Sequence, residues 1–535
     1  MWQQNYTPIA GSLGFSALVA ALPVFTLLYL LGVKRKPAWI AALSGLAAAA
    51  LVALVAYRMP AVTMLSAVGY GAAFGLFPIA WVVFCAILLY RITLTTGKFE
   101  IVKDSVGSLT DDRRLQALLI AFAFGAFIEG AAGFGTPVAV SAAMLTGLGF
   151  SPFYSAAICL LANTAPVAFG SIGTPILALS TVTGLPKEAL SAWVGRICAP
   201  ISLIVPAYLL AVMGGWRALK GVMLGAVVCG ISFSVTQLLV SNFIGPELTD
   251  ILSSLASIGS LVLLFLLWKP KDHFDLEGHS APAVVPKRHP VGDLVLAWAP
   301  YVILVVMVLI WGFYKVELSK VSYVIPWPGL DKQILQTQPV VAKPTPYGAA
   351  YRFDWLSASG TACLIASLLS ALLLRMSLGQ FLKVLAATAR QLAVSILTIA
   401  SVLALAFLMN YSGATATLGL AFAATGVLFP FFSSLLGWLG VFLTGSDTSA
   451  NALFGNLQVV TAGRLGLDPV LMAASNSSGG VMVKMISLQS IAVAAAATGL
   501  KSEEEAKLFR FTLKHSIILA SAIGLITMLY SHLIR

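Results

Sequence analysis

The sequence predicts an all-α, polytopic integral membrane protein, and three observations lead to this fold class. Hydrophobic residues make up 59% of the 535-residue chain and charged residues only 10%, whereas a soluble domain carries roughly 25% charged residues. The mean hydropathy is +0.95. Apolar runs of about 20 residues, each able to cross roughly 30 Å of hydrocarbon, recur along the whole chain. A lipid bilayer is therefore the expected surrounding, and soluble catalysis is excluded.

The distribution of charge predicts how the chain crosses the membrane. The formal net charge is +12, and Lys and Arg gather mainly in short loops, as the positive-inside rule requires. We prefer this explanation to a nucleic-acid partner. Residues 34–36 and 97–114 are expected in the cytoplasm, which places the N-terminus on the outer, periplasmic side.

The apolar runs predict the membrane helices in order. Ordinary spans are predicted at Ile9–Val33, Trp39–Tyr57, residues 189–213, Gly221–Val240, Ile251–Trp268 and Asp293–Phe313. Residues 61–95 predict one long helix, bent near Pro78. The polar segment 269–291 predicts a cytoplasmic connector, and residues 315–353 predict a long polar loop on the outside.

The second half of the chain repeats the order of the first. Matching segments, at offsets between 313 and 317, are Trp39–Tyr57 with Leu356–Leu374, 61–95 with 377–409, Ser151-Pro152 with Asp468-Pro469, and Asn163-Thr164 with Asn476-Ser477. The halves start on opposite sides of the membrane, which predicts an inverted repeat, although similar helical hairpins can also align by composition alone. The predicted units are a first repeat (1–215), two additional helices (216–268), the connector (269–291) and a second repeat (292–535).

Two Gly-rich stretches interrupt the apolar runs at matching places. They are Phe127-Ile-Glu-Gly-Ala-Ala-Gly-Phe-Gly-Thr-Pro137 and, 315 positions later, Phe442-Leu-Thr-Gly-Ser-Asp-Thr-Ser-Ala-Asn451. Interrupted or re-entrant hairpins in corresponding positions of two halves indicate the substrate site of a secondary transporter.

Four charged residues lie within or beside these apolar runs. A carboxylate at the membrane centre costs roughly 2.5–3.5 kcal/mol, so Glu129 is a candidate for carrying a coupled proton. Alternatively, backbone N–H groups or Arg196 hold it as a helix-end carboxylate. Asp447 is the second proton-coupling candidate, or else a helix N-cap. Lys484 and Arg196 are candidates for binding an anion, and Asp447 is the expected partner of Lys484.

Glycines and small polar residues beside the interruptions complete the candidate substrate site. Gly133 and Gly135 allow a close backbone approach, and Thr136 lies at the start of the resuming helix as a hydroxyl donor or N-cap. The remaining candidates are Asn163, Thr174, Ser446, Asn451, Asn476 and Ser478. Any one of them can instead satisfy backbone groups at a kink.

Neither a metal nor a cofactor is expected. The five Cys are single residues within apolar segments, and the five His show no ligand spacing.

The motifs resemble those of a known family. Glu129-Gly-Ala-Ala-Gly-Phe-Gly-Thr-Pro137, Asn163-Thr-Ala-Pro166, Gly173-Thr-Pro175, Thr444-Gly-Ser-Asp-Thr-Ser-Ala-Asn-Ala-Leu-Phe-Gly455 and Ser475-Asn-Ser-Ser-Gly-Gly480 closely resemble the bacterial L-lactate permease family. The similarity extends over almost the whole chain. It implies 12 to 14 membrane segments and proton-coupled uptake of lactate, and often glycolate, across the inner membrane.

The expected function is thus symport of a small 2-hydroxymonocarboxylate anion with a proton. A sodium-coupled carboxylate transporter and a passive anion channel are the alternatives. The sequence does not indicate an oligomeric state or a preferred hydroxy acid.

Overall fold

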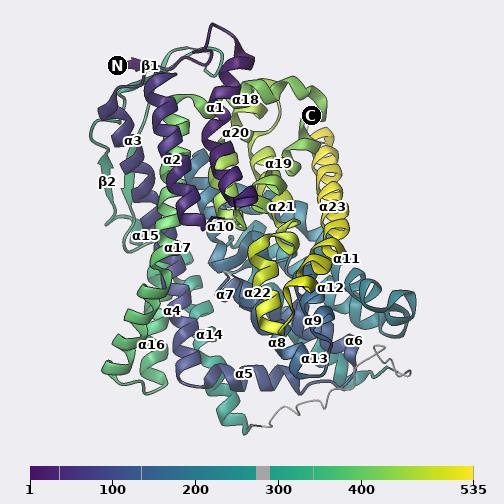
Figure 1. Ribbon diagram of the computed structural model, residues 1–535. Helices are drawn as coiled ribbons and strands as arrows, with labels where there is room; N and C mark the ends of the chain where they lie inside the picture. Colours follow the sequence, from purple (N-terminus) through teal and green to yellow (C-terminus); the bar gives the residue numbers. More distant parts are fainter. Residues whose placement is uncertain (35, 134, 271, 273–288, 342, 534–535) are drawn as a thin grey trace.

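The computed structural model describes residues 1–533 apart from residues 35, 134, 271, 273–288 and 342, and the molecule is almost entirely helical (Figure 1). Within this part of the chain, 12 helices are long and apolar enough to cross a membrane, or 13 when one bent pair is taken as a span. The predicted all-α, polytopic fold is confirmed.

The first half contains the elements β1 (Trp2–Gln3), α1 (Leu13–Leu28), η1 (Tyr29–Val33), α2 (Ala38–Val55), α3 (Ala61–Phe74), η2 (Gly75–Ala80), α4 (Trp81–Thr95), α5 (Lys98–Gly107), α6 (Arg113–Gln116), η3 (Ala117–Phe124), α7 (Gly125–Ala131), α8 (Thr136–Gly147), α9 (Pro152–Ala162), η4 (Val167–Phe169), α10 (Gly170–Thr183) and α11 (Lys187–Gly221). Two further helices, α12 (Met223–Phe243) and α13 (Thr249–Leu267), follow.

The second half contains α14 (Val291–Phe313), α15 (Lys315–Ser319), β2 (Tyr323–Pro326), β3 (Ile334–Gln336), β4 (Thr345–Tyr347), β5 (Ala350–Phe353), α16 (Ser359–Leu373), α17 (Leu378–Ser412), α18 (Ala414–Phe422), η5 (Ala423–Leu428), α19 (Phe429–Thr444), α20 (Asp447–Leu465), α21 (Pro469–Val481), η6 (Lys484–Ile486), α22 (Leu488–Thr498) and α23 (Ser502–Leu533).

Two long helical segments run lengthwise through the molecule (Figure 1). The first is α3–η2–α4, which bends where Phe77 leaves the helical conformation just before Pro78, as predicted. The second is α17, which packs against α3. A β-carbon on Gly71 would lie 2.6 Å from the Leu403 carbonyl oxygen, so the missing side chain lets the two backbones approach closely.

The polar loop 315–353 meets the N-terminus. Strand β3 pairs in parallel with β1, with Trp2 opposite Ile334, and in antiparallel with β4. A separate antiparallel pair joins β2 to β5. The pairing places the N-terminus and this loop side by side. Most of the predicted connector 269–291 lies outside the described residues.

Each half contains one helical hairpin and one broken helix. The hairpins are η3–α7 with α8, which are joined between Ala131 and Thr136, and α19 with α20, which are joined between Thr444 and Asp447. In Figure 1 the first approaches the centre of the molecule from below and the second from above. The broken helices are α9–α10, bent by 64°, and α21–α22, and a short 3₁₀ turn (η4 or η6) lies in each break.

The two halves pack against each other at the same places. Helix α10 of the first broken helix packs on α20 of the second hairpin, and α22 of the second broken helix packs on α8 of the first. The Asn451 side chain donates to the Pro175 carbonyl oxygen across the first of these contacts, at 3.2 Å. Both hairpin turns and both breaks are thereby brought to the middle of the molecule.

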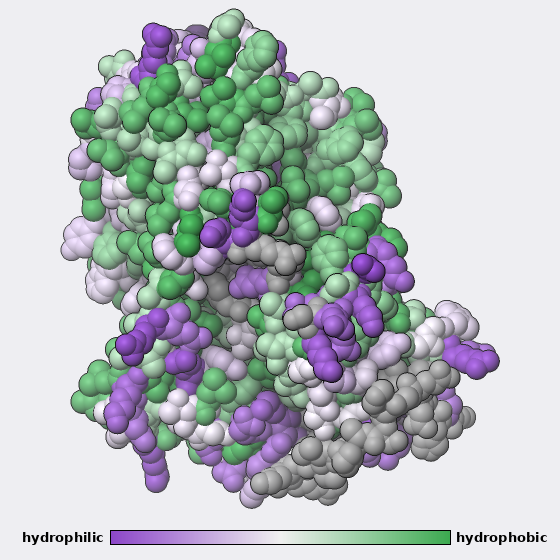
Figure 2. Space-filling model, viewed as in Figure 1, coloured by the Kyte–Doolittle hydropathy of each residue, from purple (hydrophilic) through white to green (hydrophobic). Residues whose placement is uncertain are grey.

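The surface agrees with immersion in lipid. Figure 2 shows a largely hydrophobic upper half over α1, α2 and α3, whereas hydrophilic residues gather in the lower half and in a hollow near the middle. Exposed leucine, valine and phenylalanine side chains on α1, α12, α13 and α14 are the expected lipid contacts.

A buried ion pair fastens the connector between α12 and α13 to its neighbours. Glu247 pairs with Lys187 on α11 and accepts a hydrogen bond from Ser359 on α16 at 3.0 Å. Burial raises the pKa of the Glu247 carboxyl, but the Lys187 charge and these hydrogen bonds outweigh that effect and hold the pKa below its ordinary value. Because the folded-state pKa is depressed, the stabilisation is present above the unfolded-state pKa and is lost as the pH falls through the folded-state value.

We expect Glu247→Gln to destabilise the protein by about 2–3 kcal/mol at neutral pH, because it leaves the buried Lys187 charge unpaired. Thermal unfolding in detergent at pH 7 and at pH 3 measures this difference, which should shrink at the lower pH. Glu188→Gln is the control, because its pair with Lys315 is more than half exposed and contributes little. Equal effects of the two substitutions would contradict the assignment.

Candidate functional site

Lys484 lies in the break of the second broken helix. Helix α21 begins with Asp468, which caps the N–H groups of Val470 and Leu471, and Pro469 occupies its first turn. The helix ends at Val481, and Lys484 opens the short turn η6. Its Nζ donates to the Gly445 carbonyl oxygen at 2.5 Å, at the C-terminal, negative end of α19. The lysine therefore reaches from the break to the turn of the second hairpin.

Asp447 begins α20 and is anchored by a chain of side-chain amides. Its Oδ2 accepts hydrogen bonds from Ser477 at 2.6 Å and from Asn451 at 3.2 Å. Asn476 donates to Asn451 at 2.9 Å, and Gln458 donates to Asn476 at 3.0 Å. The second oxygen, Oδ1, is buried without a partner among the described residues. Two donors on one oxygen stabilise the ionised form of this carboxylate.

Glu129 lies near the end of α7 with its carboxylate facing the first break. A β-carbon on Gly170 would lie 2.4 Å from Glu129 Oε1, so only glycine at this position leaves room for the carboxylate. The side chain is 5% exposed, and its Oε2 lacks a partner within the described part of the chain. Asn163 lies next to it, without a well-formed hydrogen bond.

An unusual backbone follows the first break. Ser171, Ile172 and Gly173 have φ angles of 46°, 58° and 70°, in the left-handed region, and regular helix resumes at Thr174. A β-branched residue seldom adopts this conformation, and local strain of this kind is concentrated at functional sites. Ser171 Oγ donates to the Ala132 carbonyl oxygen at 2.7 Å, which links this turn to that of the first hairpin.

These elements enclose a cavity of about 140 Å³. It is lined by Glu129, Gly170, Ser171, Thr174, Pro175, Ser395, Thr398, Thr444, Gly445, Ser446, Asp447, Thr448, Ser449, Lys484 and Gln489, together with Ala38, Val167 and Ile399. The first residues of α10, α20 and α22 belong to this lining, so three helix N-termini face one space. Free N–H groups, hydroxyls and one ammonium around a small cavity suit a small hydroxylated anion.

The structure brings five of the predicted site residues to this cavity. They are Glu129, Thr174, Ser446, Asp447 and Lys484. Asn451, Asn476 and Ser478 lie on α20 and α21; the first two support Asp447, while Ser478 donates to the Ala474 carbonyl oxygen. The N-cap of α20 is Ser446, whose Oγ accepts from the Ser449 N–H at 3.3 Å, so Asp447 is not the cap.

Other predicted residues lie away from the cavity. Gly135, rather than Thr136, is the N-cap residue of α8, and Gly135 faces Val493 on α22. Gly133 has a φ of 63° and lies against Ser171. These residues form the turn of the first hairpin without lining the described cavity.

Two predicted ion pairs are not found within the described residues. Arg196 donates to Asn242 Oδ1 at 2.9 Å and lies over the Trp193 ring, so it does not pair with Glu129. Lys484 bonds a carbonyl oxygen instead of the Asp447 carboxylate. The cation of the cavity is therefore held close to two carboxylates without being paired with either.

The sequence did not predict several cavity residues and one buried carboxylate. Ser171, Thr448, Ser449 and Gln489 flank predicted residues, and their place next to a break was the available signal. Asp250 lies in the first turn of α13, outside the predicted repeats, where an acidic residue is typical of any helix. Among the described side chains, no group of three or more His, Cys, Asp and Glu is arranged to hold a metal ion.

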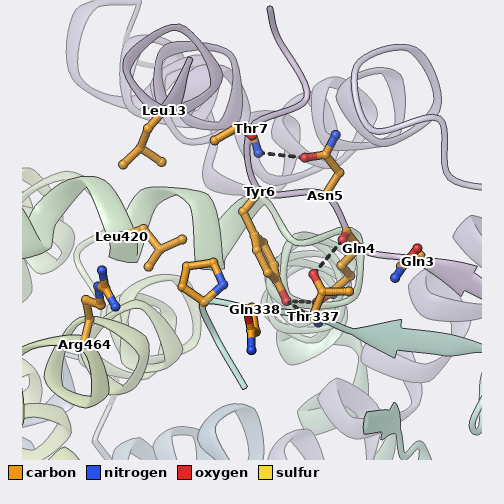
Figure 3. Close-up of a pocket in the computed structure, with 11 residues that line it drawn as sticks. Gln3, Gln4, Asn5, Tyr6, Thr7, Leu13, Thr337, Gln338, Leu420 and Arg464 are labelled. Carbon is orange, nitrogen blue, oxygen red and sulfur yellow. Dashed lines mark hydrogen bonds between the residues drawn. The ribbon is translucent and has the colours of Figure 1, made fainter. Parts of the chain in front are cut away.

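A larger cavity of about 580 Å³ lies at the far end of α20, and Figure 3 shows its lining. Gln4 and Tyr6 are hydrogen-bonded to each other there, and Arg464 lies on the opposite side. Arg464 is in the last turn of α20, some 25 Å from Asp447 at ~1.5 Å per residue. This cavity lacks the helix breaks and buried carboxylates of the smaller one, so its size alone does not make it the site.

Helical hairpins and broken helices around a cavity lined by charged residues are typical of a multi-pass membrane transporter, and the names of the relatives, which are permeases and not enzymes, agree with this class. The chain belongs to the L-lactate permease family, whose model matches residues 16–534.

Relatives cover almost the whole length of the protein. The chain is 48% identical to the glycolate permease of Escherichia coli K12, over 99% of its own length and 98% of the relative. It is 47% identical to the L-lactate permease of Bacillus subtilis strain 168, with coverage of 99% and 98%. Identity to the L-lactate permease of Escherichia coli K12 is 45%, with coverage of 100% and 99%. Among solved structures, the YdaH transporter of Alcanivorax borkumensis is similar with a TM-score of 0.46 and 14% identity, over 86% of each chain.

Proposed function

We propose that the protein takes up L-lactate, and with it D-lactate and glycolate, across the bacterial inner membrane by proton symport. The observation that carries this proposal is the 140 Å³ cavity in which Lys484, Glu129 and Asp447 meet at the turns and breaks of both halves. The names of the relatives, lactate and glycolate permeases, support the choice of substrate.

The substrate carboxylate binds to Lys484 and to the N-terminal N–H groups of α10 and α20. A charge-assisted hydrogen bond from an ammonium is stronger than a neutral one, and helix N-termini favour an anion. The substrate hydroxyl bonds to the Ser and Thr side chains of the lining. A methyl group on carbon 2 distinguishes lactate from glycolate, and the cavity has room for both.

Proton coupling follows from the balance of charge. In the empty site the nearby Glu129 carboxylate balances the charge of Lys484 without contacting it, and the substrate anion takes over that role when it binds. The displaced carboxylate is then buried without a counter-charge, so it binds a proton. We assign the proton to Glu129, because two donors to Oδ2 favour the ionised form of Asp447, whereas neither oxygen of Glu129 accepts a well-formed hydrogen bond among the described residues.

The two halves form an inverted repeat in this proposal, with α12 and α13 as added helices. The opposite approach of the two hairpins in Figure 1 supports the inversion. The N-terminus lies in the periplasm and the basic loops 34–36 and 97–114 in the cytoplasm.

Uptake of labelled L-lactate into proteoliposomes, with an imposed pH gradient and with or without sodium, tests the proposal. Accumulation driven by the pH gradient alone is expected, and about tenfold accumulation per pH unit is the limit for one proton per anion. A requirement for sodium at fixed pH would favour sodium coupling. Equilibration without accumulation would favour a channel.

A further inference from the structure

A third carboxylate lies behind the cavity. Asp250, in the first turn of α13, is 1% exposed and does not belong to the described lining of the cavity. Neither of its carboxylate oxygens has a hydrogen-bond donor within the described residues. A buried, ionised carboxylate without donors or a counter-charge is strongly destabilised, so this group requires a proton or a cation.

Asp250 lies directly against the residue that follows Glu129. A β-carbon on Gly130 would be 2.8 Å from the Cβ of Asp250, and 3.0 Å from the Ile251 side chain. Only glycine at this position lets α13 approach α7 so closely. The Glu129 carboxylate acts electrostatically on Asp250, and the two negative charges repel each other.

The surroundings of Asp250 supply no described positive charge. The elements packed against α13 are α7, α10, α12 and η3, and their titratable groups are Glu129 on α7 and Cys229 on α12. Helix α11 packs on α12 and brings Cys198 near Asp250; it also carries Arg196, which donates to Asn242. Glu247, three residues earlier, is already paired with Lys187. Lys484 acts on Glu129 from the cavity side.

Neutral polar side chains without partners surround the same place. Asn163 is 4% exposed, lies next to Glu129, and has both amide atoms unpartnered as far as the described chain shows. Gln237 donates to the carbonyl oxygen of Ala165, which follows Asn163 by two residues, at 3.3 Å. The Gln237 Oε1 is likewise unpartnered in the described structure. Unpaired buried donors and acceptors require an explanation, and at Asn163 the exchange of a proton at the neighbouring Glu129 supplies one.

We propose that Glu129 and Asp250 act as a pair that shares the coupled proton, an inference that rests on the proposed symport. In the empty site the pair holds one proton, with Asp250 protonated and Glu129 ionised opposite Lys484. When the substrate anion neutralises Lys484, the pair binds a second proton.

The second proton arrives through Asp250: its O–H bond breaks as a new one forms at Glu129, and Asp250 then binds the incoming proton. Release of the anion on the other side of the membrane is followed by release of one proton. Because Asp250 lies outside the cavity, the proton reaches Glu129 by a path that bound substrate does not block.

Asp250→Asn tests the pair in proteoliposomes, with L-lactate exchange and pH-gradient-driven accumulation measured side by side. Under a gradient of one pH unit, we expect accumulation to fall from about tenfold to near equilibration while exchange continues. The dependence of uptake on pH should also weaken, because Glu129 can no longer exchange its proton with Asp250. Asp293→Asn is the matched control, since Asp293, in the first turn of α14, is about half exposed and pairs with Lys98 at the start of α5, and it should change neither quantity.

Asp250→Ser is a second neutral variant with the same expected result, in case the Asn protein does not fold. Wild-type accumulation and an unchanged pH profile in either folded variant would overturn the proton pair while leaving the symport intact. Wild-type protein that fails to accumulate lactate under a pH gradient, or that requires sodium, would instead overturn the proposed function itself.

Discussion

Replacing Lys484 by Gln is expected to lower the ratio of maximal rate to KM for L-lactate transport by about 100-fold, because the anion loses its charged donor. A hydrogen bond to a charged group contributes about 1.5–3 kcal/mol, and 3 kcal/mol corresponds to roughly 100-fold. The loss should appear mainly as a raised KM. Initial rates of labelled L-lactate exchange over a range of concentrations measure it, and exchange is the better assay because it does not depend on the proton gradient.

Two further variants are measured for comparison: Lys484→Arg, which conserves the charge, and Lys501→Gln, which is the control. The Arg variant keeps the charge in a different shape and should recover part of the activity. Lys501 is exposed in the loop before α23, so its substitution should have no effect. Exchange by the Lys484→Gln protein within about threefold of the wild type would show that the anion does not bind at this cavity.

Glu129→Gln is expected to abolish accumulation while lactate exchange continues. A glutamine resembles the protonated glutamic acid in size and charge but cannot release a proton. Under a gradient of one pH unit the wild type should approach about tenfold accumulation, whereas the variant should only equilibrate lactate. Its exchange rate should also lose its dependence on pH, which measurements between pH 5 and pH 8 will show.

Two comparison variants decide whether this effect belongs to Glu129 alone. Glu317→Gln, on the exposed helix α15, should behave as the wild type. Asp447→Asn should weaken substrate binding and protein stability together, because it disturbs the contacts with Ser477 and Asn451. If Asp447→Asn uncouples transport and Glu129→Gln does not, the proton belongs to Asp447.

Composition and periodicity predicted most of the fold. Apolar runs located the ordinary spans within a few residues, because a lipid-spanning helix needs a long apolar segment whatever its neighbours are. The bend of residues 61–95 followed from Pro78, and the two Gly-rich interruptions coincide with the turns of the two helical hairpins. The small sheets that join β1 to the loop 315–353 were not predictable, since long-range strand pairing leaves no periodic signal in so short a strand.

The site was predicted in outline, and the wrong predictions of residue position have related physical reasons. Glu129, Asp447 and Lys484 were visible because charge is conspicuous within apolar sequence. The positions of Thr136 and Arg196 depend on which way a helix faces, which a single sequence does not specify. Asp250 was hidden because an acidic residue in the first turn of a helix is common, and only packing against Gly130 places it beside Glu129.

The number of protons taken up when lactate binds tests the central claim most directly. Titration calorimetry of the purified protein, in buffers with different ionisation enthalpies, measures this number without any gradient. If lactate replaces Glu129 as the group that balances the Lys484 charge, Glu129 binds a proton. The wild type should then take up about one proton per lactate, and the Glu129→Gln variant none. Lactate binding with no proton uptake by the wild-type protein would contradict proton coupling at this cavity.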